Sequence, residues 1–185
     1  MTMLTRMMAR GTVVLATAGN MLQALQMRLT AGEVKDDLEH FEPYGFTSHP
    51  KAGAEGIALF LGGDRSHGVV VCVADRRFRL KELKPGEVAL YTDEGDSFVF
   101  KRGRVVELET LTLKVKAERA VEFDTEVFKV TASSGVEFET PAITTTGSIE
   151  SDGDQVAAGI SQIQHVHDGI SRGNAESNPP VGAAP

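Results

Sequence analysis

A five-residue pattern that returns every 15 residues is the feature that most constrains the fold of this chain. Residues 106–110, 121–125 and 136–140 each read valine, glutamate, a large apolar residue, an acidic residue and threonine. This alternation of apolar and polar residues indicates a strand with one buried face. A second alternating segment follows at the same spacing, at residues 113–117 and 128–132. Each unit therefore predicts two short strands joined by polar turns.

Units this short cannot bury an apolar face alone and must stack on neighbours. A single-chain β-helix of hexapeptide type needs about 18 residues for a three-sided coil, and the repeat here is 15 residues long. The repeat therefore favours several copies of the chain wrapped around one axis, most simply a homotrimer. Residues 106–150 hold four basic and nine acidic residues, which predicts an acidic outer surface that resists aggregation. A plain β-meander in a monomeric domain is the alternative.

The N-terminal half of the chain has the texture of a small β-barrel or sandwich, in which short apolar runs are separated by turn residues. Strands are expected at residues 11–17, 57–61, 66–73 and 88–92. Residues 21–29 have helix-forming side chains but also alternate, and the preceding Gly19 and Asn20 favour a β-hairpin over a helix. Residues 36–39 are compatible with a short strand or a turn.

Charge and cysteine content exclude several classes of protein. The formal net charge is −7, so the chain lacks the basic footprint typical of nucleic-acid binding. The single cysteine, Cys72, excludes an internal disulfide and lies in an apolar run that predicts a buried strand thiol. No run approaches the ~20 apolar residues of a membrane helix, and residues 1–10 lack the apolar region of a signal peptide. We therefore expect assembly in a cytoplasm.

His165 and His167 are the candidate metal ligands. In a strand, residues two positions apart lie on one face, so both imidazoles can reach a common point. One chain supplies two nitrogens, whereas three chains around an axis supply six. Such an octahedral set favours iron or nickel over tetrahedral zinc, and it leaves no open position for substrate. The site would therefore be structural, and a solvated histidine pair in a tail is the alternative.

Other polar residues have simpler interpretations. Three scattered histidines are predicted to be surface or turn residues: His40, His49 and His67. Three acidic residues share a turn but lack the EF-hand spacing, and are predicted to be solvated: Asp93, Glu94 and Asp96. The basic stretch at residues 76–84 is predicted to be a solvated face. No nucleophile–base spacing or paired-carboxylate motif is present, so we do not expect an enzyme.

The order of these features resembles the Mu-like central spike proteins of contractile-tailed phage baseplates, which are related to the P2 spike protein. The resemblance is carried by turns at residues 44–45, 50–56 and 63–66, by residues 86–91 leading into the repeats, and by the terminal histidine pair with its tail. Family tails often have proline after the second histidine, where this chain has Asp168.

The resemblance implies an all-β protein in three parts. Residues 1–95 would form an OB-fold barrel, residues 96–150 the shaft of a trimeric intertwined β-helix, and residues 151–185 a metal-binding apex. One iron ion per trimer would be held there by His165 and His167 of each chain. The family also implies calcium and chloride ions, for which the sequence identifies no residues.

The implied function is mechanical. A homotrimer in the virion would cap the tail tube at the baseplate, dock on a trimeric hub protein, and pierce the host outer membrane. The alternative is a binding module, in which an OB-type barrel on an oligomeric stalk binds a glycan such as lipopolysaccharide. A metal-dependent hydrolase using the histidine pair is disfavoured, because Asp168 would be its only nearby general base.

Overall fold

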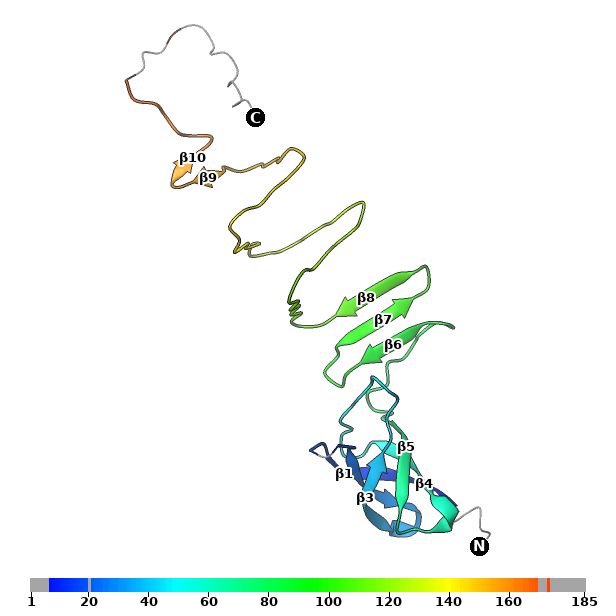
Figure 1. Ribbon diagram of the computed structural model, residues 1–185. Helices are drawn as coiled ribbons and strands as arrows, with labels where there is room; N and C mark the ends of the chain where they lie inside the picture. Colours follow the sequence, from blue (N-terminus) through cyan, green and yellow to red (C-terminus); the bar gives the residue numbers. More distant parts are fainter. Residues whose placement is uncertain (1–6, 20, 170–172, 174–185) are drawn as a thin grey trace. The chain divides into compact units, whose positions relative to one another are not determined.

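The computed structural model describes residues 7–19, 21–169 and 173 (Figure 1). Apart from short helical turns it is all-β, as predicted. The chain divides into two units, Met1–Val121 and Glu122–Pro185. The domain boundaries expected from the sequence, after residues 95 and 150, stay predictions. Within the described part of the chain, no helix is long and apolar enough to span a membrane.

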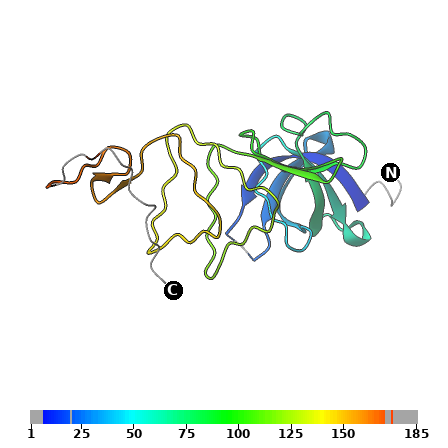
Figure 2. The same cartoon turned by 90° about the horizontal axis from the view of Figure 1, so that it is seen from above.

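The first unit begins with a closed five-stranded barrel in the order β1-β2-β3-β5-β4 (Figure 2). Neighbouring strands are antiparallel except for β3 and β5, which pair in parallel and close the barrel. This arrangement is consistent with the predicted OB-like fold. The strands are β1 (Met8–Thr17), β2 (Ala24–Leu29), β3 (Val34–His40), β4 (Glu55–Phe60) and β5 (Gly68–Ala74). Two 3-10 turns, η1 (Thr30–Gly32) and η2 (Leu61–Gly63), follow β2 and β4.

The β1–β2 hairpin confirms the interpretation favoured for residues 21–29, because the turn places β2 against β1 from Thr17↔Ala24 to Gly11↔Leu29. The core of the barrel comes from alternate strand positions and includes Leu25, Met27 and Phe60, all at most 1% exposed. Register shifts place an extra residue in β1, in β3 and in β5, and these bulges increase the twist that a small barrel needs to close. At Gly68, an added Cβ would lie 2.6 Å from both Leu38 and Phe60, so a larger residue would displace the core.

A three-stranded antiparallel sheet follows within the same unit, in the order β6-β7-β8. Its strands are β6 (Val88–Tyr91), β7 (Ser97–Lys101) and β8 (Val105–Glu109), and β8 contains most of the first repeat. The turns between them contain Gly95 and Gly103, both with positive φ.

After β8, the described residues contain no strand until β9 (Val156–Ala157), and the ribbon of this segment carries no arrows (Figure 2). Every residue from 101 to 154 is exposed. The second unit ends its regular structure in a short hairpin of β9 and β10 (Ile160–Ser161). The wound β-helix and the metal-binding apex expected from the sequence stay predictions.

Candidate functional site

The β6–β8 sheet has one face made entirely of large apolar side chains. Cross-strand pairing aligns Val88 with Phe100, and Phe100 with Val106. The next row on the same face aligns Leu90, Phe98 and Leu108. We call these six residues the apolar sheet face. Five of them are between 48% and 61% exposed, and Phe98 is partly buried. A contiguous apolar face of this kind marks a surface that another element covers.

The repeat extends this apolar character into the second unit. Val106 and Leu108 of the apolar sheet face correspond, 15 and 30 residues later, to four exposed residues: Val121, Phe123, Val136 and Phe138. The threonines that end the second and third repeats make the same local contact, because the hydroxyls of Thr125 and Thr140 each donate to the carbonyl two residues onward. The sequence repeat is therefore also a repeat of local geometry.

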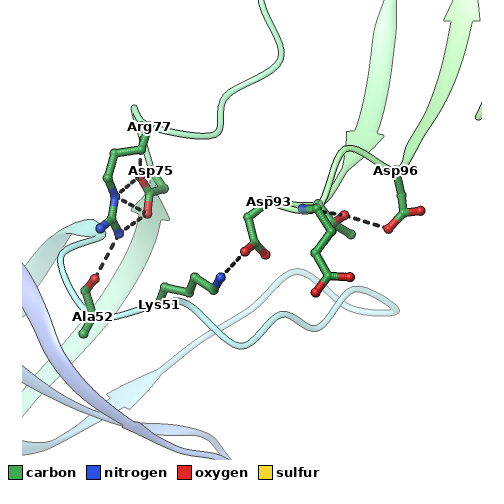
Figure 3. Close-up of polar contacts among 8 residues, drawn as sticks. Lys51, Ala52, Asp75, Arg77, Asp93 and Asp96 are labelled. Atoms are coloured by element: carbon green, nitrogen blue, oxygen red, sulfur yellow. Dashed lines mark hydrogen bonds and ion pairs between the residues drawn. The ribbon is translucent and has the colours of Figure 1, made fainter. Parts of the chain in front are cut away.

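A set of polar contacts joins the barrel to the β6–β7 turn (Figure 3). Lys51, in the loop before β4, forms an ion pair with Asp93. Nearby, the Arg77 guanidinium donates to Asp75 and, over 2.9 Å, to the carbonyl of Ala52. Hydrogen bonds from Arg77 lower the pKa of Asp75, and the contact with Lys51 lowers the pKa of Asp93. Both carboxylates are therefore ionised at neutral pH and fix the loops on either side of the junction.

The acidic turn predicted to be solvated is thus partly structural. Besides Asp93, Asp96 accepts hydrogen bonds from the hydroxyls of Thr110, over 2.8 Å, and Thr92, over 2.9 Å. These bonds lower the pKa of Asp96. Asp96 therefore ties the β6–β7 turn to the end of the first repeat. The sequence carried no local sign of this, because Thr110 lies 14 residues away.

OB-type barrels bind ligands on a surface formed by strands 2 and 3 and by two loops, one between strands 1 and 2 and the other between strands 4 and 5. In this chain that surface is acidic. A groove of about 410 Å³ lies between Met21 and Leu22 of the β1–β2 loop and His67 of the β4–β5 loop. Its β3 wall carries three carboxylates: Asp36, Asp37 and Glu39. These charges would repel a phosphate backbone, so the groove disfavours nucleic acid.

Two predictions about single residues are wrong. Cys72 is exposed, because the extra residue of β5 between Val70 and Cys72 breaks the alternation that would place Cys72 on the buried side with Val70. His40 is buried at 5% exposure, with its Nδ1 3.4 Å from Oε1 of Gln23. Burial lowers the pKa of His40. The other two scattered histidines, His49 and His67, are exposed as predicted.

The basic stretch is engaged more than predicted. Arg76 forms an ion pair with Glu55, which also pairs with Arg10. Arg77 holds Asp75, as described above, and its guanidinium also lies 5.1 Å from the centre of the Phe78 ring. This stretch is therefore partly fixed against the barrel rather than wholly solvated.

The structure places His165 and His167 side by side at the end of the described chain. Their ring centres lie 5.2 Å apart and both side chains are exposed. Neither residue lies in an assigned strand, although the sequence argument placed them in one. Nδ1 of His165 lies 2.8 Å from the carbonyl oxygen of Ser161. A carbonyl only accepts, so Nδ1 is the donor, and in the neutral ring Nε2 keeps its lone pair.

The described residues contain no group of three or more histidine, cysteine, aspartate or glutamate side chains placed to hold a metal ion. The histidine pair is therefore a two-nitrogen donor set in one chain. Its imidazoles are accessible, and Nε2 of His165 is free to bind. These residues fit a shared metal site to which each chain contributes two ligands.

Comparison with known proteins gives matches over the N-terminal part of the chain. Residues 10–77 match the family model described as Bacteriophage Mu Gp45, N-terminal. The chain is 35% identical over 113 residues to the baseplate puncturing device gp45 of Escherichia phage Mu, covering 60% of this chain and 57% of that protein. It is 40% identical over 98 residues to the Mu-like prophage FluMu protein gp45 of Haemophilus influenzae, covering 48% and 53% respectively.

The chain thus spans somewhat more than half the length of the curated relatives it matches. The match covers the barrel, which runs from β1 to β5. These findings confirm the resemblance predicted from the sequence, and they support the expected location in the tail baseplate of a virion.

Proposed function

We propose that this chain, a Mu-like baseplate spike protein by its similarity, acts as a homotrimeric central spike that caps the tail tube and pierces the host outer membrane. The observation that carries the proposal is the unbroken exposure of residues 101–154, whose sequence nevertheless alternates like buried strands. The name of the phage Mu relative, a puncturing device, supports the same role. Function would then lie in stiffness and shape rather than in turnover.

Burial of the repeat in a trimer would supply the energy that holds the spike together. Complete burial of one large apolar side chain contributes about 1.5–3 kcal/mol. The apolar sheet face and its counterparts at Val121, Phe123, Val136 and Phe138 offer several such side chains per chain. Three copies wound around one axis would cover all of these side chains. The chains could not separate without exposing them again to water. The acidic residues would lie on the outside.

The barrel would dock on the trimeric hub protein of the baseplate. The ion pair of Lys51 with Asp93 supports this arrangement, because it ties the loop before β4 of the barrel to the β6–β7 turn. Force applied to the barrel would pass through this contact into the sheet.

The histidine pair would hold one iron ion per trimer through six imidazole nitrogens. Such a closed site would supply no catalysis, because it has no position for water or substrate. It would clamp three chain ends that otherwise fray. The calcium and chloride ions implied by the family have no assigned residues, and we propose no site for them.

The test is to measure mass by light scattering and iron content by elemental analysis on the same untagged, full-length sample. The proposal expects three chains per particle and one iron per three chains. A monomer at micromolar concentration would contradict the spike. Iron at one per chain would point to a site within one chain, completed by a residue such as Asp168.

The double variant His165→Ala with His167→Ala separates the two halves of the proposal. The expected result is loss of iron from an intact trimer, because the long shaft interface lies outside the apex. Loss of the trimer would mean that the metal, rather than strand wrapping, holds the chains together.

A further inference from the structure

The segment just before the histidine pair forms a small hydrogen-bonded scaffold. Strands β9 and β10 pair Val156 with Ser161 and Ala157 with Ile160 (Figure 1). The two turn residues, Ala158 and Gly159, have φ of 50° and 82°, as a type I′ hairpin requires. The hairpin is therefore a defined structure, although it is only two residue pairs long.

One carboxylate organises this hairpin from outside. Asp154 accepts a hydrogen bond over 3.1 Å from the backbone N–H of Ile163, on the far side of the turn. Hydrogen bonds from the Ser161 hydroxyl and from backbone N–H groups lower the pKa of Asp154, which is therefore ionised at neutral pH. The N–H of Gln162 also donates to the carbonyl of Gln155 over 2.9 Å, which extends the hairpin.

Ser161 transmits this order to His165. Its hydroxyl oxygen accepts from the N–H of Gln164 over 2.7 Å, which fixes the turn leading to the histidine. Its carbonyl oxygen lies 2.8 Å from Nδ1 of His165. The bond selects the tautomer with the proton on Nδ1 and leaves Nε2 as the nitrogen able to bind a metal. Outer contacts of this kind orient ligating histidines and raise their basicity.

We propose that Asp154 and Ser161 are positioning residues that present Nε2 of His165 for metal binding. Neither residue would touch the metal. Asp154 fixes the β9–β10 hairpin, and Ser161 fixes the imidazole ring of His165. The ring then presents Nε2 in one direction. This inference rests on the proposed iron site, since a positioning residue needs a ligand to position.

The first experiment compares Asp154→Ala with Asp152→Ala in the full-length protein. Asp152 is exposed, carries the same charge two residues upstream, and makes none of these hydrogen bonds. We expect Asp154→Ala to lower iron affinity by about 10- to 100-fold in competition with a chelator, and Asp152→Ala to leave it unchanged. Both variants should remain trimers by light scattering. Equal iron affinity in the two variants would overturn the proposal.

A second measurement separates positioning from a general loss of apex structure. Nitrogen-15 spectroscopy of metal-free protein with labelled histidines reports which ring nitrogen carries the proton. It is recorded above pH 8, and His165 is assigned with His165→Gln. We expect the Nδ1–H tautomer in wild type and a mixture of tautomers in Asp154→Ala. Asp154→Asn keeps one acceptor oxygen and should give an intermediate result.

An Nε2–H tautomer in wild type would refute the positioning role, even if iron binds. A wild-type trimer without iron would instead refute the iron site of the proposed function. In that case a retained Nδ1–H tautomer would show that the scaffold orders His165 for something other than iron, and the metal-positioning proposal would fall with the site.

Discussion

The barrel and the repeat segment are built from the same kind of alternating sequence, but they differ in where their apolar faces go. In the barrel, Leu25 and Met27 are fully buried by their own chain. In the repeat segment, Phe123 and Phe138 are each 69% exposed. The barrel closes on itself, so every strand has two neighbours, whereas the described residues of the second and third repeats form no strand and have no strand neighbour within the chain. Alternation therefore specifies which face is buried, but not which chain covers it.

The largest expected effect comes from placing a charge on the repeat. Phe123→Asp would bring three carboxylates to one axis in the proposed trimer. A buried unpaired charge costs several kcal/mol, so we expect assembly to fail while the barrel stays folded. Light scattering would report the loss of the trimer, and circular dichroism the retained barrel.

Lys129→Asp is the matched control, because it also introduces a carboxylate but at a position that alternation places outside. It should still give a trimer. An intact trimer of Phe123→Asp would show that the faces are assigned in reverse or that the repeat has no partner.

A substitution in the barrel core should lower the stability of the barrel without affecting assembly through the repeat. Leu25→Ala removes a fully buried side chain and should lower the free energy of unfolding of the barrel by about 2–5 kcal/mol. The trimer should persist, because Leu25 is far from the repeat in sequence and belongs to the barrel core. Thermal melts followed by circular dichroism, with light scattering below the transition, would measure both properties.

Leu15→Ala makes the same substitution on the neighbouring strand, at a side chain that is 58% exposed. Its effect should stay within about 0.5 kcal/mol. Comparable destabilisation by the two variants would mean that the outer face of β1 is also covered in the assembled protein.

Acid should affect the barrel through His40. Burial lowers the pKa of His40 in the folded state, although Glu42 nearby acts in the opposite direction. As pH falls below about 6.5, the unfolded chain therefore binds the proton first. The stability contributed by neutral His40 is complete above that pH and is lost as pH falls through the lowered folded-state pKa. We expect the melting temperature of the metal-free barrel to decline in this range.

His40→Gln should flatten this part of the pH profile, whereas His49→Gln, at an exposed position, should leave it as in wild type. A wild-type profile that is flat between pH 7 and pH 5 would argue against the buried neutral imidazole.

The smallest effect is expected at the junction of the barrel and the sheet. Lys51→Ala removes an ion pair between exposed groups, so its influence on overall stability should be slight and should vanish in high salt. Hydrogen exchange of the β6–β7 turn should nevertheless accelerate, because Asp93 loses its anchor. Lys51→Arg should restore the protection of the β6–β7 turn from hydrogen exchange. Unchanged exchange in Lys51→Ala would show that this ion pair does not transmit force from the barrel to the sheet.

The sequence alone was sufficient to predict features whose pattern repeats at short intervals along the chain. Alternation and turn residues located most strands of the barrel, and the Gly19–Asn20 pair pointed to the β1–β2 hairpin that the structure contains. β3 was left open, because its polar residues compete with the strand pattern. The 15-residue repeat was visible because each unit carries its own face, while its winding around partners stays a prediction.

Features that depend on distant residues could not be predicted. Cys72 lies in a strand whose residues are apolar on both faces. The apolar–polar alternation that would distinguish the buried face from the exposed face is therefore missing. His40 is buried near Gln23, 17 residues earlier, and Lys51 meets Asp93 across 42 residues. The spacing of His165 and His167 identified the candidate site, but only the structure shows the Ser161 carbonyl that orients the His165 ring.

The exposure of residues 101–154 also bears on how such a protein is made and how long it lasts. A newly synthesised chain would hold a folded barrel and a shaft segment with nothing to fold against, so the rate of maturation would rise steeply with chain concentration. In the proposed trimer, exchange of one subunit would require unwinding the whole length of the repeat segment. Mixed trimers of labelled and unlabelled protein should therefore form during synthesis and hardly at all afterwards.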